Sequence, residues 1–352
     1  MVRAVIADDS GVMREILTEI LESGGIDVVA TARDGEEAVE AIFEHDPDVA
    51  TIDIDMPRMD GHEVIERVMD QQPTPMIVIS ANVGEGTEAT FEALELGAVD
   101  FFAKPGGEMS IDIWSKRDEI VEKVSVTATV DPATLTPTSA HKREREELSA
   151  VGVGEEFPDE PTVVIGASTG GPKVVERVLA ELPERAGLRI LVVQHMADHY
   201  TKRFAQRLDE RSAYRIREAD ARDRIGPGEG VLAKAGYHLE VTGVHNGEVI
   251  VTHDDGPKRH NVRPAIDVTM ETAARNVDGT LLGVIMTGMG SDGAEGLAAI
   301  KEAGGKAIVQ DEETSRVYGM PKVAAETVDV DMILPEDRIA EGIINAFRGW
   351  SA

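Results

Sequence analysis

One serine in the second half of the sequence has the surroundings that a nucleophile requires. Ser168 lies within Gly166-Ala167-Ser168-Thr169-Gly170, between an expected strand and an expected helix. A G-x-S-x-G spacing in this context is typical of a serine held on a sharp strand-to-helix turn. Small glycines beside a serine also cap helices and bind phosphates. The motif by itself therefore leaves both a nucleophile and a helix cap open.

A nucleophilic serine needs a base, and His195 is the best placed of the nine histidines. It directly follows an expected core strand, on the sheet edge where Ser168 must lie. His199 falls in or before the next helix. Four further histidines belong to a region of short strands and loops: His238, His245, His253 and His260.

The acid that orients the base should come from the same sheet edge. Asp292 meets this condition because it follows a third buried strand, in a glycine-rich loop that allows close approach. Asp267 and Asp223 are weaker candidates, since no clear strand delivers them.

These residues suit the logic of a catalytic triad. Ser168 would attack a carbonyl carbon, His195 would take its proton, and Asp292 would orient the imidazole. Backbone N–H groups near Thr169 and Met289 could hold the oxyanion. The chain order Ser…His…Asp argues against the α/β-hydrolase superfamily.

Acidic residues in the first half of the sequence suit phosphoryl chemistry instead. Asp8, Asp9 and Asp53 all follow strands, so their carboxylates can converge at one sheet edge. Three such carboxylates repel each other unless a hard cation such as Mg²⁺ lies among them. Asp53 could accept a phosphoryl group, and Lys104, after another strand of this edge, could neutralise its oxygens. Any one of these acids alone could be a helix cap or a solvated loop residue.

Two further residues could report such a modification. Ser80 ends a strand, and its hydroxyl could hydrogen-bond the phosphoryl group. The ring of Phe102 could repack behind the site.

Alternating strand and helix signals define the element order of the first half. Five strand–helix units of this length predict a parallel sheet with helices on both faces. The expected strands are 2–7, 27–30, 48–52, 76–80 and 99–102, and the expected helices are 10–21, 36–44, 61–70, 85–96 and 112–123.

A change of composition separates this half from the rest. Residues 125–160 are rich in Thr, Pro, Ala and charged residues, which indicates a linker. Residues 161–352 predict a second, doubly wound α/β domain with buried strands at 162–167, 189–193, 281–286 and 306–310. Residues 214–252 are expected to form short strands and turns.

Residues 1–124 resemble a two-component response-regulator receiver domain. The resemblance rests on Ala7-Asp8-Asp9-Ser10, the segment from Asp53 to Gly61, Ser80-Ala81 and Lys104-Pro105. It implies that Asp53 is the phosphoacceptor and that Asp9, Asp53 and the carbonyl of Asp55 bind Mg²⁺, with Asp8 close by. It places Ser80, Phe102 and Lys104 at the switch positions.

Residues 161–352 resemble the CheB family of chemotaxis protein-glutamate methylesterases. The resemblance rests on five segments: 165–172, Gln194-His195-Met196, 262–267, 287–293 and Tyr318-Gly319-Met320-Pro321. It places the triad on Ser168, His195 and Asp292. One departure is Ser291, where the family is expected to have Asn.

Together the two resemblances imply a regulated enzyme of chemotaxis. Its substrates would be glutamate methyl esters, and also unmodified glutamines, on the cytoplasmic helices of chemoreceptors. Its phosphodonor would be the chemotaxis histidine kinase. Mg²⁺ would serve the receiver domain, and no cofactor is implied for the esterase. A response regulator that only binds a partner and an esterase of small molecules are the competing hypotheses. The presence of all three triad residues argues against the first.

The charge balance excludes several other classes. Asp and Glu number 66 against 35 Lys and Arg, a formal net charge of −31. This balance argues against a nucleic-acid ligand, which requires a basic face, and against docking on anionic lipid. The absence of Cys excludes disulfides, thiolate metal sites and a Cys nucleophile. Because neither a signal peptide nor a membrane-length apolar run is recognisable, we expect a cytoplasmic protein with no direct membrane insertion.

Two explanations of this acidity lead to different behaviour in salt. The acids are spread over many helices, which favours a surface adapted to a salt-rich cytoplasm over steering toward a basic partner. Salt screens repulsion among surface charges, so we expect the melting temperature to rise between dilute and molar KCl. A thermal melt followed by circular dichroism measures this. Equal or greater stability in dilute buffer would favour partner steering.

Overall fold

The computed structural model describes residues 1–80, 86–104, 111–135 and 160–348. The chain divides into two compact units, Met1–Thr138 and Ser139–Ala352, each described here by itself. Most of the expected linker 125–160 falls on residues 136–159, outside the described residues.

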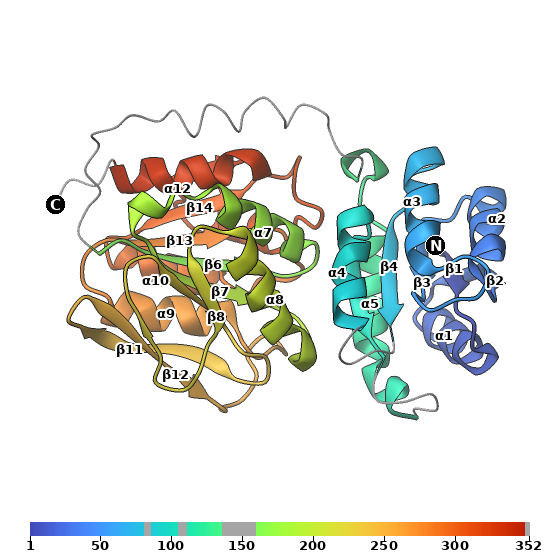
Figure 1. Cartoon of the computed structure of the whole chain (residues 1–352), viewed down its shortest axis with the longest axis horizontal. Helices are drawn as coiled ribbons and strands as arrows, with labels where there is room; N and C mark the ends of the chain where they lie inside the picture. Colours follow the sequence, from blue (N-terminus) through green and yellow to red (C-terminus); the bar gives the residue numbers. More distant parts are fainter. Residues whose placement is uncertain (81–85, 105–110, 136–159, 349–352) are drawn as a thin grey trace. The chain divides into compact units, whose positions relative to one another are not determined.

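The first unit is a parallel five-stranded sheet covered by helices on both faces, as the sequence predicts (Figure 1). Its strand order is β2-β1-β3-β4-β5, and every neighbouring pair is parallel. Helices α1 and α5 pack together, and α2, α3 and α4 pack as a second group. The elements are β1 (Arg3–Ala7), α1 (Gly11–Ser23), β2 (Asp27–Ala32), α2 (Gly35–His45), β3 (Val49–Ile52), α3 (Gly61–Gln71), β4 (Met76–Ser80), α4 (Gly86–Leu96), β5 (Asp100–Ala103) and α5 (Arg117–Thr127).

Local side-chain caps explain where the helices of this unit begin. Ser10 accepts a hydrogen bond from the N–H of Met13 at the start of α1. Asp60 and Glu63 form a reciprocal capping box at the start of α3. Such caps satisfy N–H groups that have no partner inside the helix.

The end of this unit differs from the sequence expectation. The helix expected at 112–123 is a 3₁₀ helix, η1 (Ile111–Lys116), followed by α5, which continues to Thr127. A short 3₁₀ turn, η2 (Pro132–Thr134), follows. The packed helix runs past residue 124 because Val124 and Thr127 are both buried.

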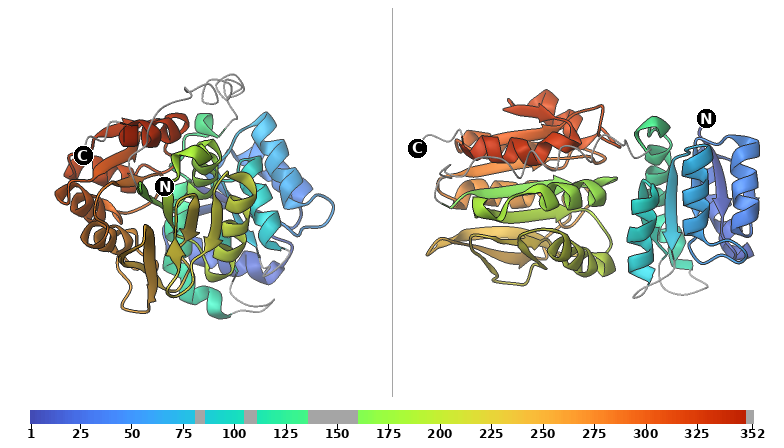
Figure 2. Two further views of the ribbon diagram at one scale, coloured as in Figure 1. Left: turned by 60° about the vertical axis from the view of Figure 1, so that its left-hand side comes forward. Right: turned by 45° about the horizontal axis from the view of Figure 1, so that its top comes forward.

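The second unit contains a parallel seven-stranded sheet of order β15-β14-β13-β6-β7-β10-β8. Helices α7, α8 and α12 form one packed group, and α9, α10 and α11 form another (Figure 2). No helix in the described ranges is long and apolar enough to cross a bilayer. The strands of this sheet are β6 (Thr162–Ala167), β7 (Arg189–Gln194), β8 (Arg215–Glu218), β10 (Glu229–Leu232), β13 (Leu281–Ile285), β14 (Lys306–Gln310) and β15 (Met332–Leu334). The helices are α7 (Gly171–Glu181), η4 (Glu184–Ala186), α8 (Asp198–Arg211), α9 (Ile266–Asn276), α10 (Ala294–Glu302), α11 (Met320–Thr327), η5 (Glu336–Arg338) and α12 (Ile339–Arg348).

The middle of this unit departs from the sequence expectation in two ways. Of the short strands expected at 214–252, β8 and β10 extend the main sheet, whereas β9 (Arg224–Ile225), β11 (His238–His245) and β12 (Glu248–Asp254) form a separate antiparallel sheet. Helix α9 was not expected, although Ile266, Met270 and Ala273 are buried at helical spacing. The buried side of this helix also carries the polar residues Asp267, Thr269 and Thr272, so the sequence shows no continuous apolar stripe.

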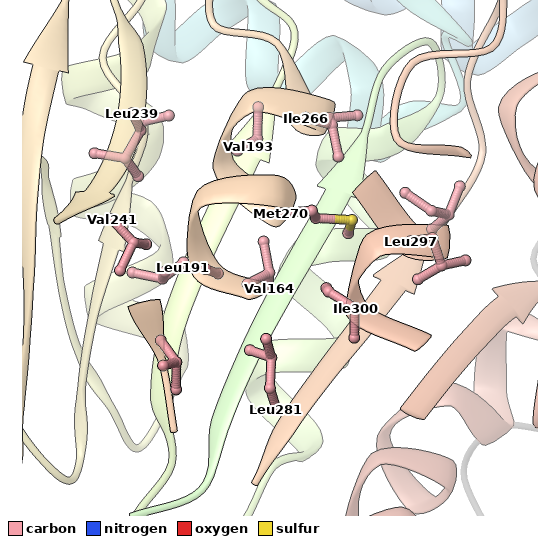
Figure 3. Close-up of a cluster of buried hydrophobic side chains, with 14 of the residues drawn as sticks. Val164, Leu191, Val193, Leu239, Val241, Ile266, Met270, Leu281, Leu297 and Ile300 are labelled. Carbon is pink, nitrogen blue, oxygen red and sulfur yellow. The ribbon is translucent and has the colours of Figure 1, made fainter. Parts of the chain in front are cut away.

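A large apolar cluster fixes α9 and α10 against the sheet (Figure 3). Val164, Leu191 and Leu281 come from the sheet, and Met270 and Ile300 come from the two helices. Leu239 and Val241 of the antiparallel sheet close the cluster from the side. The loops that precede α9 and α10 are thereby held at fixed positions.

Truncating one of these buried side chains should destabilise the second unit. Ile300 is fully buried, and we expect Ile300→Ala to cost about 2–5 kcal/mol, through lost apolar contact and the cavity left behind. Ile333 in β15 is 50% exposed, so Ile333→Ala serves as the matched control, with an expected cost within about 1 kcal/mol. Chemical denaturation of both variants in molar KCl measures the difference. Equal costs would show that the cluster does not carry this packing energy.

Candidate active site

Ser168 and His195 lie side by side at the carboxyl edge of the seven-stranded sheet. Strands β6 and β7 are parallel neighbours, and Ala167 pairs with Gln194 in their register. The N–H of His195 continues the ladder by donating to the carbonyl of Ala167 at 3.1 Å. The residue that follows each strand is therefore placed opposite the other, as the sequence predicts.

The loop after β13 approaches Ser168 from the opposite side. Strand β13 pairs with β6, and the N–H of Ser168 donates to the carbonyl of Thr287 at 3.0 Å. Gly288 must be a glycine, because a Cβ atom there would lie 2.8 Å from the Cβ of Ser168. This is the point where the chain order reverses in the sheet, the usual location of a functional site in an open α/β sheet.

Asp292, in the same loop, contacts the imidazole of His195. The Nε2 atom of His195 lies 2.9 Å from Oδ2 of Asp292, which is only 2% exposed. The N–H groups of Ile266 and Asp267 also donate to this carboxylate, at 2.7 and 3.0 Å. Burial raises the pKa of Asp292, but the hydrogen bond and charge of His195, together with the two N–H groups, outweigh it, so the pKa lies below its ordinary value. Asp292 is therefore held as a carboxylate.

The contact with Asp292 determines which nitrogen of His195 is available as a base. A carboxylate accepts the hydrogen bond, so Nε2 carries the proton and Nδ1 is left for proton transfer. Among the described residues, no hydrogen bond joins Oγ of Ser168 to His195. Catalytic hydrogen bonds often close only when substrate is bound.

Two backbone N–H groups beside Ser168 have no partner among the described residues. They belong to Thr169 and Met289, the two residues expected to contribute to an oxyanion hole. Thr169 is held by its carbonyl, which accepts a hydrogen bond from the Thr287 hydroxyl at 2.9 Å. Free N–H groups held rigidly at this edge can stabilise a negative oxygen.

Two buried glutamines that the sequence interpretation missed brace this edge. The side chain of Gln194 donates to the carbonyls of Ser168 and His195, at 2.8 and 3.0 Å. Gln310 accepts from the N–H of Thr287 at 2.8 Å. Glutamine at the end of a core strand was the available signal, since a buried amide must find partners.

Two weaker candidates for the acid lie in different places. The carboxylate of Asp267 is fully buried beside Asp292 and accepts from the N–H groups of Gly293 and Gly296. Asp223 lies in a turn, where it accepts from the N–H of Asp220 and pairs with Arg217. Only Asp267 is therefore part of the surroundings of Asp292.

The remaining histidine candidates have other positions. Both ring nitrogens of His238 bond to backbone, at Ala265 and Pro257, and His253 bonds to the carbonyl of Ala219. His199 is exposed in α8, and His245 is exposed at the end of β11. His260 lies 2.7 Å from Asp267.

The first unit gathers its expected acidic residues at the carboxyl ends of β1 and β3. Oxygen atoms of Asp8, Asp9 and Asp53 lie within 4.8 Å of one another. The Nζ atom of Lys104 lies 2.8 Å from both Asp8 and Asp53. Asp55 follows Asp53 in the same loop. An all-oxygen donor set with one exposed member fits a hydrated Mg²⁺ ion.

Burial and charge act against each other in this cluster. Burial raises the pKa of Asp53 to about 6, although Lys104 partly offsets this, and Asp8 and Asp9 add to it. Burial lowers the pKa of Lys104, but Asp53 and Asp8 outweigh that effect and raise it. The ammonium group is thus held charged against the two carboxylates.

Of the two residues expected to report modification, only Phe102 has a described side chain. Ser80 ends β4, but its side chain lies outside the described residues. Phe102 points into the core between α1 and α5, where it packs with residues such as Leu17 and Ile120. The neighbouring Phe101 faces α4, where its ring meets that of Phe91 edge-on at 6.2 Å. Since successive strand residues face opposite sides, the aromatic ring on the α4 side is Phe101 and not Phe102.

Comparison with known proteins gives matches over both units. The family model described as "CheB methylesterase" matches residues 163–343, and that described as "Response regulator receiver domain" matches residues 4–112. A Haloarcula marismortui protein named "Protein-glutamate methylesterase/protein-glutamine glutaminase" is 49% identical over 358 residues, covering 98% of this chain and 97% of that protein. A Natronomonas pharaonis protein of the same name is 50% identical over 346 residues, with coverages of 98% and 97%.

A solved structure matches the second unit. The crystal structure of the Thermotoga maritima CheB methylesterase catalytic domain aligns with a TM-score of 0.51 and 39% identity. It covers 53% of this chain and 97% of that structure's chain.

Proposed function

The chain belongs to the CheB methylesterase family, and on this premise we propose that it hydrolyses glutamate methyl esters on chemoreceptors to glutamate and methanol. It also deamidates receptor glutamines, releasing ammonia. The names of the relatives from Haloarcula marismortui and Natronomonas pharaonis give both activities. In chemotaxis these reactions serve adaptation, and the receiver unit regulates them.

The observation that carries the proposal is the contact between His195 and Asp292 beside Ser168. The 2.9 Å bond to a buried carboxylate fixes both the orientation and the protonation of the imidazole. The register of β6 and β7 puts Ser168 next to it. A serine hydrolase of esters and amides uses these three groups in this relation.

The chemistry proceeds in two steps through an acyl-enzyme. The Oγ atom of Ser168 attacks the acyl carbon of the ester, its proton passes to Nδ1 of His195, and that proton then leaves with methanol or ammonia. In the second step His195 takes a proton from water as the water oxygen attacks the acyl carbon, and it returns a proton to Oγ as the glutamate side chain leaves Ser168. Asp292 stabilises the charged imidazole in both steps, and the free N–H groups of Thr169 and Met289 stabilise the oxyanion.

The receiver unit supplies the control. Asp53 is the proposed phosphoacceptor, Lys104 neutralises an added phosphoryl oxygen, and Asp8, Asp9, Asp53 and the carbonyl of Asp55 would hold Mg²⁺. When bound, Mg²⁺ offsets negative charge during phosphoryl transfer. Ser80 and Phe101, whose ring faces α4, would respond to the phosphoryl group.

The proposed partners and location follow from these two chemistries. The phosphodonor is a chemotaxis histidine kinase, and the substrate is the cytoplasmic helices of chemoreceptors, so the chain acts in the cytoplasm. The proposal includes no nucleic-acid ligand, no membrane insertion and no cofactor for the esterase.

Removal of the nucleophile tests the esterase assignment. Ser168→Ala should lower methanol release from methyl-labelled receptor membranes by at least about three orders of magnitude, because no other group can form the acyl-enzyme. His195→Ala should be nearly as severe, and Asp292→Ala should leave more activity, since Asp292 acts only through the imidazole of His195. Ser212→Ala, at the end of α8, is the matched serine control. Near-wild-type activity of Ser168→Ala would exclude the assignment, and inactivity of the wild-type chain on receptor membranes would exclude the substrate.

The control by the receiver unit has its own test. If the unphosphorylated receiver unit restrains the esterase, a fragment beginning at Pro158 should release methanol faster than the full chain. This start keeps Glu160, whose carbonyl and carboxylate bind the buried Arg189. In the full chain, Asp53→Asn should lose activation by a small phosphodonor and keep basal turnover.

Initial rates of the three proteins at matched concentration give the answer. A fragment no faster than the unphosphorylated full chain would contradict simple restraint. The receiver unit would then act by positioning the enzyme on its receptor.

A further inference from the structure

Asp292 and Asp267 are two buried carboxylates that cap helices reciprocally. Asp292, just before α10, accepts from the first two N–H groups of α9, those of Ile266 and Asp267. Asp267, in the first turn of α9, accepts from Gly293 and Gly296 at the start of α10, at 2.9 and 2.7 Å. Neither helix has a side-chain cap of its own, because the residues at the cap positions are Ala265 and Gly293. Each carboxylate therefore replaces the missing cap of the other's helix.

This exchange brings two negative charges together in the interior. Asp267 is fully buried, and Asp292 is 2% exposed. A buried carboxylate remains ionised only where donors surround it. Asp292 has His195 and two N–H groups. Asp267 has two N–H groups on one oxygen and needs a donor for the other.

His260 supplies that donor. Its Nε2 atom lies 2.7 Å from Oδ2 of Asp267 and 3.9 Å from Oδ1 of Asp292. Among the described residues, no other side chain donates a hydrogen bond to Asp267, since the Nε atom of Arg259 stays at 3.7 Å. The ring of His260 is thus the side-chain donor of Asp267, and it also lies near Asp292.

The backbone holds His260 in this place. His260 and Asn261 both have positive φ angles, 51° and 62°, in a tight turn closed by two hydrogen bonds between Arg259 and Val262. Arg259 pairs with Glu271 of α9 at 2.8 Å and with Glu295 of α10. The turn is therefore tied to both helices.

The charges around the pair set the balance of protonation. Burial raises the pKa of Asp267, the N–H of Gly296 lowers it, the charge of Asp292 raises it, and His260 and Arg259 lower it, so the pKa lies above its ordinary value. The other charged groups that face the cluster are His195 on Asp292, and Glu271 and Glu295 on Arg259. Loss of a donor from Asp267 would therefore be felt at Asp292.

We propose that His260 is a positioning residue of the hydrolase, which acts through Asp267 to keep Asp292 aligned with His195. The inference rests on the proposed function, because it assigns a role in the same reaction. His260 touches neither the substrate nor the reacting atoms. Its contribution is the hydrogen bond from Nε2–H to Asp267.

Two substitutions in the full chain separate this hydrogen bond from the bulk of the ring. His260→Phe keeps a ring without the donor, and His260→Gln places an amide N–H near the position of Nε2. We expect His260→Phe to lower kcat by about tenfold, the effect of losing a partly buried hydrogen bond to a carboxylate, with little change in KM. His260→Gln should stay within about twofold of wild type. His245→Gln, at the exposed end of β11, is the matched histidine control.

The pH profile provides a readout that a purely structural role would not move. Without its donor, Asp267 takes up a proton, because burial already raises its pKa and a buried carboxylate stays ionised only among donors. The negative charge that faces Asp292 and His195 is then lost, which disfavours the protonated form of both groups. The acid limb of kcat/KM should therefore move to lower pH in His260→Phe, by up to about one unit, and much less in His260→Gln.

Methanol release from methyl-labelled receptor fragments in molar KCl measures both quantities, with melting temperatures recorded for every variant. A lower kcat and a downward shift of the acid limb in the Phe variant, with rescue in the Gln variant, support the proposal. Wild-type behaviour of the Phe variant overturns it, and so does equal loss in both variants. An inactive wild-type chain would instead contradict the proposed function, so the two failures are distinguishable.

Discussion

A charge in the interior must be met by fixed donors, and this constraint shapes the second unit. Asp292 is useful to His195 only while it is ionised, yet its burial opposes ionisation. The first turn of α9 meets the requirement with two N–H groups at the positive end of a helix. The N-terminus of α9 must therefore stay at one position, and the apolar cluster around Met270 and Ile300 holds the helix there. The packing of the core therefore also sets the positions of the catalytic residues.

The two units place their chemistry by the same topological rule but satisfy their carboxylates differently. Asp9 and Asp53 follow neighbouring strands where the order of the first sheet reverses, and Ser168 occupies the equivalent point in the second. In the first unit a flexible side chain, Lys104, lies against the carboxylates. In the second unit, backbone N–H groups fixed in helices do so. A movable cation suits a site whose charge changes on phosphorylation, whereas a rigid set of dipoles suits a triad that must stay aligned.

The sequence predicts the residues that depend on local pattern and fails where distant segments meet. Strand ends reveal Asp8, Asp53, Ser168 and His195, because apolar runs and the parallel order bring such residues to one edge. The contact of Asp292 with the N–H of Asp267 joins a loop to the first turn of a helix 25 residues away, so no spacing rule shows it. The sequence also does not show which side of the sheet the neighbouring rings of Phe101 and Phe102 face, because both helix-covered faces are apolar.

The net charge of −31 and the buried carboxylates respond differently to salt. At molar salt the screening length falls to about 3 Å, so exposed pairs such as Arg33 with Glu37 contribute little. Asp267 and Asp292 are shielded from ions by the protein around them, and four of their hydrogen-bond donors are backbone N–H groups. The acidic surface can therefore adapt to the surrounding electrolyte without weakening the network behind His195. A catalytic acid anchored by helix N–H groups in place of surface cations is consistent with a chain that has few lysines and many exposed acids.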